Sequence, residues 1–348
     1  MGRTTFPKIL LRIALISFFL CACGDKNLPV SNTGLSDDLP ITQPDKPPAY
    51  RCPLDGTPLE EMPVRPVAIV IDNMPAAWPQ SGVNQADIVY EIPAEGGITR
   101  FLAVYFHGKA EKIGPVRSAR PYLMDLAREW EAVFIHCGES PQAQVYFKEK
   151  NIDHINEMFH PPGFWRDKSR RAPNNLYTGT KEIWAEIEKK GWDRQVDIEG
   201  FHFDDTLEPE ENEPVYEVTV KYPYRNIIYK YDVSSGLYHR FLGSKPQQDG
   251  ETGDQYAAAN ILIQEVGTKV FDQEGRMEIN LLGKGNAILF SRGRVFNGMW
   301  EKDSFSERTY FTDDKGEEFK LAPGQTWIIL KPKNTVYEYS TLWQDNSQ

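Results

Sequence analysis

Cysteine is scarce in this chain of 348 residues, which contains only four. Cys21 and Cys23 lie near the start, and Cys52 and Cys137 follow much later. No CxxC pair and no Cys/His pairing at zinc spacing occurs, so we expect no metal site. Cys52 and Cys137 could form one disulfide in oxidising surroundings. The frequent burial of free cysteines favours two unpaired thiols instead.

The motifs of several enzyme classes are also missing. The chain has no GxSxG, no HExxH, no P-loop and no GxGxxG between a strand and a helix. The formal net charge is -11, which argues against nucleic acid or an anionic membrane surface as a general partner. Any anion site must therefore be local.

Long hydrophobic runs are lacking as well, and the one at the start is informative. The apolar run Ile13 to Leu20 is much shorter than the roughly 20 residues that span a bilayer. Cations precede this run, and the small Ala22 precedes Cys23, as in the signal peptide of a lipoprotein. We interpret residues 1–22 as a cleaved signal and Cys23 as the acylated N-terminus, carrying two buried chains. An ordinary secretory signal cut nearby or an uncleaved anchor are the alternatives.

Residues 23–50 have the composition of a linker. They contain five prolines among Ser, Asn, Asp and Thr and show no apolar periodicity, which is typical of a disordered tether. A lipid anchor followed by a tether places the folded part at the extracytoplasmic face of the cell membrane. This location disfavours enzymes that use cytosolic ATP or nicotinamide pools, and we expect no cofactor.

The first half of the folded part, residues 51–205, alternates strand and helix patterns and predicts a mixed α/β domain. The expected strands are 67–72, 87–92, 98–106 and 132–137, and the expected helices are 118–130, 140–150 and 180–190. The last helix is followed by Gly191, a common stop signal.

The second half, residues 206–348, predicts a smaller and mostly antiparallel β domain. The expected strands are 215–222, 227–231, 237–241, 261–266, 287–290, 327–330 and 335–339, separated by turn signals at 235–236, 283–285, 292–293 and 314–316. The pattern leaves open whether this half folds alone or completes the sheet of the first half.

Three arginines form the densest group of candidate functional residues. Arg100 follows Gly96-Gly97 on a predicted strand, and Arg117 and Arg120 flank Ser118, the predicted N-cap of a helix. Cations are disfavoured at the positive end of a helix dipole unless an anion joins them. Arginine also presents forked donors to phosphate and carboxylate groups. We therefore predict an anion site at these arginines.

Internal ion pairing is the alternative explanation for these arginines. If the strands 87–92 and 98–106 form a hairpin, Glu91 could neutralise Arg100. Glu95 or Asp125 could do the same for Arg117 and Arg120. Glu91 and Glu95 are accordingly counted with the arginines as candidate site residues.

Four further residues are weaker candidates. Asp72 ends a predicted central strand, where ligands gather in open α/β sheets, but it could equally cap the next turn. His136 ends another strand and is a possible acid or base facing the arginines. Asn175 and Tyr177 could orient a sugar or peptide ligand, although Asn and Pro nearby favour a simple turn. The remaining histidines, including His107, are assigned to loops or the surface.

Several long strings resemble the YerB-like family of bacterial lipoproteins. They include Pro79-Gln-Ser-Gly82, Ala86-Asp-Ile-Val-Tyr-Glu91, Glu95-Gly-Gly-Ile-Thr-Arg-Phe-Leu102, Gly114-Pro-Val-Arg-Ser-Ala-Arg120, Asn175-Leu-Tyr-Thr178, Glu251-Thr-Gly253 and Gly324-Gln-Thr-Trp-Ile328. They occur in order over residues 65–335. The resemblance implies two family domains in tandem behind a lipid anchor, and it implies no reaction. Relatives often carry His where this chain has Met74 and Asn174, so no mechanism resting on those histidines carries over.

Two functions fit these observations. We favour a non-catalytic lipoprotein that binds an anionic cell-envelope ligand, or a partner protein, through Arg100, Arg117 and Arg120. The alternative is an extracytoplasmic enzyme acting on lipid-linked phosphate or wall-polymer substrates, with Asp72 or Glu95 as base or metal ligand.

Overall fold

The computed structural model describes residues 49–159, 162–205 and 213–342. These residues belong to one compact unit, Pro47–Gln348. The predicted signal peptide, Cys23 and nearly all of the tether lie outside the described residues. Within the described residues, no helix has the length and apolar character needed to cross a membrane.

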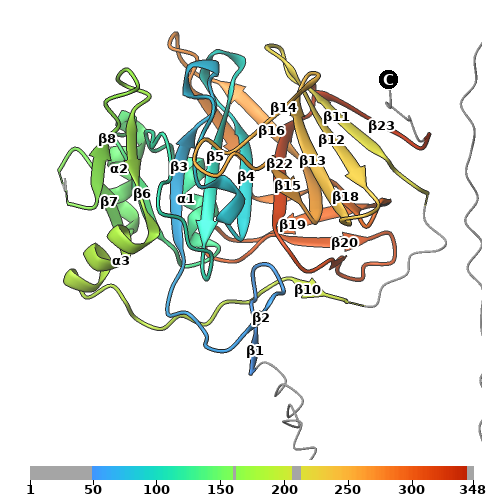
Figure 1. Cartoon of the computed structure of the whole chain (residues 1–348), viewed down its shortest axis with the longest axis horizontal. Coiled ribbons are helices and arrows are strands. Elements are labelled where there is room, and N and C mark those ends of the chain that lie inside the picture. The colour runs from blue at the N-terminus through green and yellow to red at the C-terminus, as the bar shows by residue number, and fades with distance from the viewer. Residues whose placement is uncertain (1–48, 160–161, 206–212, 343–348) are drawn as a thin grey trace, which may run out of the picture. The chain divides into compact units, whose positions relative to one another are not determined.

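One large sheet of eleven strands contains strands from both halves of the chain (Figure 1). In spatial order it runs β20 (Tyr310–Asp313), β19 (Arg294–Lys302), β18 (Gly283–Ser291), β16 (Asn260–Val270), β22 (Thr326–Pro332), β4 (Ile88–Pro93), β5 (Thr99–Tyr105), β3 (Val67–Asp72), β6 (Val133–His136) and β7 (His154–Asn156), with β17 (Met277–Asn280) beside β16. The halves meet where β22 pairs in parallel with β4. The second half therefore completes the sheet of the first.

A second sheet of six strands belongs to the second half alone. Its members are β14 (Lys245–Pro246), β13 (Leu237–Leu242), β12 (Asn226–Asp232), β11 (Glu217–Lys221) and β23 (Val336–Ser340), with β15 (Ala257–Ala258) beside β13. Every pair in this sheet is antiparallel. The strands predicted for the second half are therefore present, and they divide between two sheets.

The α-helices of the described residues all lie in the first half. They are α1 (Pro121–Arg128), α2 (Pro141–Lys150) and α3 (Thr180–Lys189). The short elements are the 3₁₀ turns η1 (Pro75–Ala77), η2 (Val83–Gln85) and η3 (Glu95–Gly97) and the strand pairs β1 (Tyr50–Arg51) with β2 (Pro58–Leu59), β8 (Phe164–Arg166) with β9 (Leu176–Thr178), and β10 (His202–Phe203) with β21 (Lys320–Leu321). The chain is thus mostly β, with a few helices.

The large sheet is buried on both faces, which explains the continuous apolar runs of its central strands. Along β3, Ile69 and Ile71 belong to the core shared with the six-stranded sheet and α3. Ala68 and Val70 belong to a second core formed with α1 and α2. Because side chains alternate along a strand, β3 needs apolar residues at successive positions to fill two cores.

Two local predictions were wrong. The helix expected from Ser118 begins only at Pro121, and Arg120 itself occupies the N-cap without a side-chain cap bond. Pro at the first helical position explains this start, because its fixed φ suits the helix and its missing N–H costs nothing there. The turn expected at 283–285 is instead the beginning of β18, which pairs with β19 along its full length.

A buried ion pair crosses between the two sheets. Glu91 of β4 accepts a hydrogen bond from Arg240 of β13 at 2.8 Å, and both side chains are at most 1% exposed. The guanidinium carbon of Arg240 lies 4.8 Å from the ring centre of Trp327 and 5.3 Å from that of Phe101. Aromatic faces attract such a cation when it is desolvated. The pair therefore ties the sheets together at a position where water is excluded.

We expect Glu91→Ala to lower the free energy of unfolding by about 3–5 kcal/mol, because it leaves the Arg240 cation buried without its carboxylate. The double variant Glu91→Gln with Arg240→Met removes both charges and should regain most of this loss. The half-buried cross-strand pair of Lys230 with Glu217, whose side chains are 35% and 32% exposed, supplies the control, since Glu217→Ala should cost at most about 1 kcal/mol. Urea denaturation measures all three. Equal losses for Glu91→Ala and Glu217→Ala would contradict the assigned role.

Candidate functional site

The segment that carries Arg117 lies at the carboxyl ends of β3 and β6. The Arg117 N–H donates to Val70 O at 2.9 Å, and Cys137 N donates to Arg117 O at 3.0 Å. The segment therefore runs between two parallel strands at the edge where open α/β sheets collect ligands. This edge also includes Asp72, the last residue of β3.

Arg117 is held by the last residue of β3 and by two loop residues. Its Nε donates to Asp72 Oδ2 at 2.6 Å, and its Nη2 donates to Asn174 Oδ1 at 2.9 Å. The same Nη2 lies 3.5 Å from Met74 Sδ. Met74 and Asn174 thus meet at one guanidinium. Asp72 also accepts from Met74 N at 3.1 Å, so it both caps the turn and pairs with an arginine.

Glu95 joins the other two arginines. Its Oε1 accepts from Arg120 Nε at 2.5 Å, and its Oε2 accepts from Arg100 Nη2 at 3.3 Å. Burial opposes ionisation of Glu95, but the charges of Arg100 and Arg120 outweigh it and lower the pKa of the carboxyl. Gly96 and Gly97 have φ values of +74° and +75°, a conformation open to glycine that brings the Glu95 loop back toward β5.

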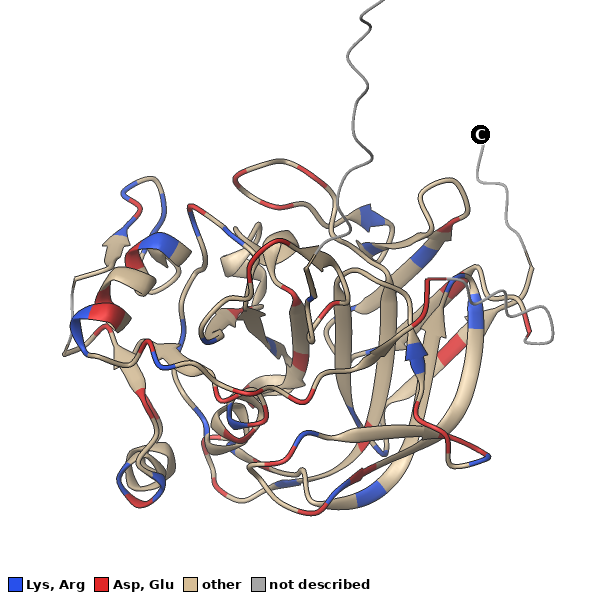
Figure 2. Cartoon of the chain, turned by 90° about the horizontal axis from the view of Figure 1, so that it is seen from below, with Lys and Arg blue, Asp and Glu red and all other residues tan. Residues whose placement is uncertain are grey.

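The arginine cluster, defined as Arg100, Arg117 and Arg120, has more positive groups than carboxylates. Three guanidinium groups meet two carboxylates, those of Asp72 and Glu95. The Arg100 Nε–H is buried and has no hydrogen-bond partner among the described residues. An unpaired buried donor is costly. The cluster therefore retains a donor and a net positive charge in a chain whose overall charge is -11 and whose acidic and basic residues are interspersed (Figure 2).

Glu91 takes no part in this cluster. The predicted hairpin is confirmed, since β4 and β5 pair antiparallel. The side chain of Glu91, however, points toward the six-stranded sheet, where it meets Arg240. Its Oε1 accepts from Thr99 Oγ1 at 2.7 Å, and its Oε2 accepts from Arg240. Arg100 is consequently paired by Glu95. Asp125, the other carboxylate considered for the arginines, accepts from Tyr146 OH on α2 instead.

Asn175 and Tyr177 stabilise the loop between β8 and β9. Asn175 Oδ1 accepts from Arg166 Nη1 at 3.1 Å. Tyr177 is buried, and its OH accepts from Arg170 Nη1 at 2.5 Å. The contacts of both side chains are those of a folded turn. A ligand role for either residue stays a prediction, and Asn174 is the residue of this loop that reaches the arginine cluster.

His136 is placed away from the arginines. Its ring is buried and stacks on Phe147 of α2, with ring centres 4.9 Å apart. Its Nε2 lies 2.9 Å from His154 Nδ1, and its Nδ1 lies 2.8 Å from Gly138 O. Burial lowers the pKa of His136 to about 3. The expectation that it faces the arginines as an acid or base is therefore wrong, because the strand end points its ring toward α2.

The two later cysteines are separate free thiols. Cys137 Sγ donates to Glu157 Oε2 at 3.2 Å. Cys52 is buried in a second polar cluster at the other end of β4 and β5, together with Asp55, Asp87 and His107. Hydrogen bonding to Asp55 and Asp87 raises the pKa of His107 to about 12.

This second cluster is not apparent from the sequence, which predicts only that His107 lies in a loop or at the surface. Its members are too far apart in the chain to form a spacing motif. One signal was available, because a hairpin of 87–92 with 98–106 brings Asp87 and His107 to the same end.

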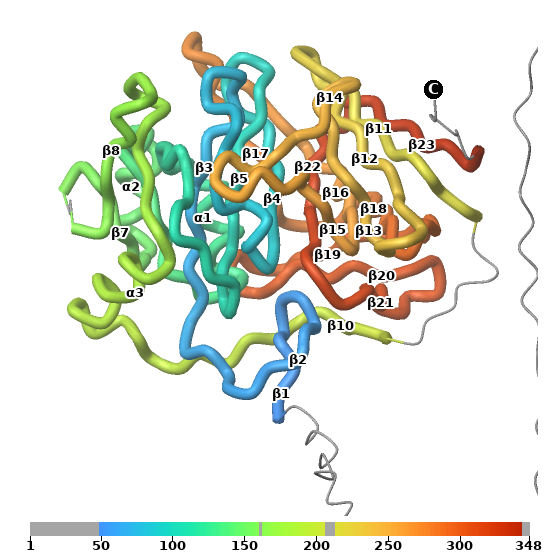
Figure 3. The backbone as a smooth tube through the Cα atoms, in the orientation of Figure 1, coloured from blue at the N-terminus to red at the C-terminus, as the bar shows by residue number. Residues whose placement is uncertain are grey.

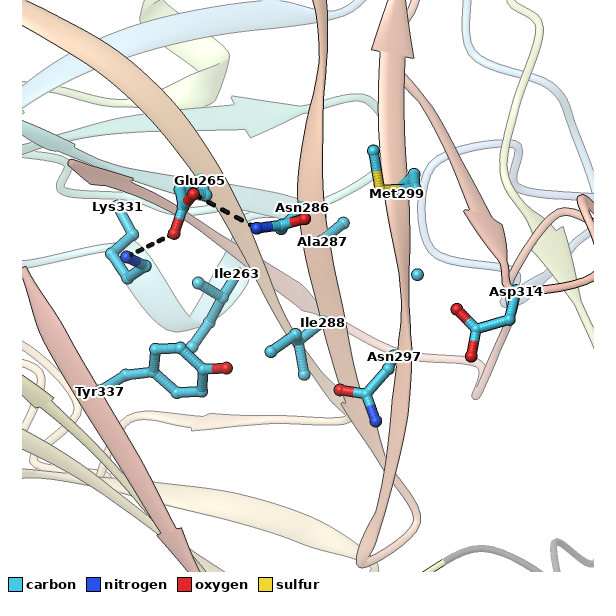
Figure 4. A pocket seen from close by; sticks show the side chains of 11 residues that line it. Ile263, Glu265, Asn286, Ala287, Ile288, Asn297, Met299, Asp314, Lys331 and Tyr337 are labelled. Carbon is cyan, nitrogen blue, oxygen red and sulfur yellow. Dashed lines mark hydrogen bonds and ion pairs between the residues drawn. The ribbon is translucent and has the colours of Figure 1, made fainter. Parts of the chain in front are cut away.

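A pocket of about 320 Å³ lies over β16, β18, β19 and β22, with Tyr337 of β23 at its side (Figure 4). Its Lys331 pairs with Glu265 at 3.0 Å, and Asn286 donates to Glu265 at 3.4 Å. The lysine charge is therefore already neutralised, and none of the predicted site residues lines this pocket.

Two family models match the chain in tandem. Residues 54–193 match the model "Protein of unknown function (DUF3048) N-terminal domain". Residues 218–328 match the model of the corresponding C-terminal domain. The chain belongs to this YerB-like family.

A named relative and a solved structure support the same assignment. The chain is 36% identical over 296 residues to the Bacillus subtilis (strain 168) protein named "Putative lipoprotein YerB", covering 83% of this chain and 88% of that protein. It also resembles the crystal structure of YerB from Bacillus subtilis, with a TM-score of 0.74 and 33% identity over 83% of this chain and 99% of the other.

The buried His136 should make stability depend on pH. Its folded pKa of about 3 lies below the unfolded value of about 6.5, so the unfolded chain binds one more proton between these values. The stabilisation is complete above about pH 6.5 and is lost as pH falls, by up to about 1.4 kcal/mol per pH unit. His136→Phe should flatten the plot of unfolding free energy against pH between about pH 6 and 4.5. Exposed His202 provides the control, and an equal flattening by His202→Phe would contradict the assignment.

Proposed function

We propose that this chain is a lipoprotein anchored through Cys23 at the extracytoplasmic face of the cell membrane. The support comes from the signal-like N-terminus, with its short apolar run before Ala22 and Cys23. It also comes from the relative named "Putative lipoprotein YerB", 88% of which is covered by the match. Two acyl chains on one cysteine give stable membrane attachment, whereas a single chain is marginal.

We further propose that the arginine cluster binds an anionic group, phosphate or carboxylate, of a cell-envelope ligand. The observation that carries this proposal is the buried Arg100 Nε–H, which has no partner among the described residues, beside an excess of guanidinium over carboxylate groups. An incoming oxyanion would satisfy that donor and balance the charge. Charge-assisted bonds to arginine are stronger than neutral ones, and its fork fits both anions.

Binding without chemistry fits the geometry better than turnover of a lipid-linked phosphate. Asp72, the candidate base, is 1% exposed, and its two oxygens accept from Arg117 and from the Met74 backbone. Glu95 is likewise shared by two arginines. Hydrolysis of a polyprenyl pyrophosphate by the unaltered protein, lost in Asp72→Asn, would overturn this preference in favour of an enzyme.

The anchor is tested by replacing each early cysteine in turn. Cys23→Ser should move the protein from the membrane fraction to the soluble or secreted fraction, because serine cannot form the thioether to lipid. Cys21→Ser, two residues earlier, is the matched control and should stay in the membrane fraction. Mass spectrometry of the N-terminal peptide reads the acyl groups directly. A diacylated N-terminus in the Cys23→Ser variant would contradict the proposal.

The anion site is tested by calorimetry on the chain from Gly24 onward, which contains every described residue. Polyprenyl phosphate in detergent and wall-polymer fragments are the two probes, and they distinguish a lipid from a polymer source. We expect saturable binding that weakens about 10- to 100-fold in Arg100→Lys, which removes the unpartnered Nε–H, since a lost charged hydrogen bond is worth about 1.5–3 kcal/mol. This variant keeps the positive charge beside Glu95 and so protects the fold.

Arg194→Ala is the control for this experiment, because Arg194 is exposed and pairs with Glu131 and Asp153, neither of which pairs with an arginine of the cluster. It should bind as the unaltered chain does. Equal affinity of the lysine variant and the unaltered chain, with both folded by circular dichroism, would remove the proposal.

A further inference from the structure

Four side chains with different donor atoms gather at the end of the β4–β5 hairpin that is remote from the arginine cluster. Cys52 and Asp55 lie in the loop after β1, Asp87 directly precedes β4, and His107 follows β5. One donor atom from each lies within 4.8 Å of the others. Cys52, Asp55 and Asp87 are buried, and the side chain of His107 is 27% exposed. Three separate segments therefore converge on one point.

The two carboxylates are held so that each turns one oxygen toward this point. Asp55 Oδ1 accepts from Thr57 N at 3.0 Å and from Thr57 Oγ1 at 2.8 Å, which leaves Oδ2 2.9 Å from His107 Nε2. Asp87 Oδ2 accepts from Phe106 N at 2.5 Å, which leaves Oδ1 2.6 Å from His107 Nε2. Hydrogen bonds that fix the outer oxygen of a carboxylate and free the inner one are typical of the second shell of a metal site.

The set of donors selects among metals. One sulfur, one imidazole nitrogen and two carboxylate oxygens make four ligands of mixed type, which suits tetrahedral Zn²⁺. Ca²⁺ and Mg²⁺ prefer oxygen ligands only and higher coordination numbers. In a tetrahedral zinc site neighbouring ligand atoms are roughly 3.3 Å apart or more. Small outward rotations of His107 and the carboxylates would provide this spacing.

We propose that Cys52, Asp55, Asp87 and His107 bind one Zn²⁺ ion. The ion has a structural role, because it fastens the loop after β1 to the strand ends of the large sheet. In Figure 3 the β1–β2 hairpin lies below β4 and β5, and this loop is the upper tip of the hairpin. Independent contacts fix the same loop: Gly324 N donates to Asp55 O at 2.7 Å, and Phe201 N donates to Pro53 O at 2.9 Å.

Metal content and a cobalt spectrum test this proposal on the chain from Gly24 onward. The protein is stripped with a chelator under reducing conditions and dialysed against Zn²⁺ or Co²⁺. We expect one ion per chain, a higher melting temperature with Zn²⁺, and a Co²⁺ spectrum with a thiolate charge-transfer band and intense tetrahedral bands. Less than stoichiometric metal in the unaltered protein would overturn the proposal.

Variants assign the ligands. Cys52→Ser should remove the charge-transfer band. His107→Gln should weaken Zn²⁺ binding at least about tenfold, because loss of a second-shell partner alone already costs about 10- to 100-fold. Cys137→Ser is the matched control, since it removes the other free thiol outside the cluster, and it should keep both band and affinity. An unchanged cobalt spectrum in Cys52→Ser would refute thiolate ligation. Because the arginine cluster lies at the other end of the hairpin, this result is independent of the anion-binding test.

Discussion

The ion pair of Glu91 with Arg240 is the constraint on which the arrangement of the two halves depends. A buried charge is tolerated only with a well-placed partner, so β4 of the first half and β13 of the second must meet at this point. The polar network extends from it: Asn73 Nδ2 lies 3.4 Å from Glu91 Oε1, Asn73 Oδ1 accepts from Gln80 at 2.7 Å, and Gln80 Oε1 accepts from Gln247 at 3.1 Å. The loop after β3 is thereby bound to the six-stranded sheet. Such a network stabilises one arrangement of the strands and loops, because any shifted arrangement would leave buried polar groups without hydrogen-bond partners.

Because Glu91 pairs with Arg240, it does not neutralise the arginine cluster, which lies on the other face of the same hairpin. With Glu91 paired across the sheets, Glu95 serves both Arg100 and Arg120, and Asp72 serves Arg117. The cluster keeps its net positive charge for that reason, and the loop with Gly96 and Gly97 determines where Glu95 can reach. The same residues thus support both explanations considered from the sequence. Internal pairs exist, and they do not neutralise the cluster fully.

The hairpin of β4 and β5 carries a polar cluster at each end. The arginines near the start of β5 provide donors suited to an oxyanion, whereas Cys52, Asp87 and His107 at the other end provide acceptors suited to a cation. Strand ends are where backbone regularity stops and polar side chains can converge, while the strand interiors are buried on both faces. The proposed metal site and the proposed anion site thus lie at opposite ends of one hairpin.

The sequence by itself determined those features that depend on neighbouring residues. Alternating or continuous apolar runs gave the strands, Ser140 before Pro141 gave the capped start of α2, and Gly96-Gly97 gave the turn in the hairpin. Tertiary structure alone decided which side chains meet: Glu91 with Arg240 across 149 positions, His136 with α2 in place of the arginines, and Cys52 with His107. Secondary structure follows local periodicity and turn chemistry, whereas these pairings depend on the register and stacking of two sheets. No local pattern encodes that register, because it results from filling two cores at once.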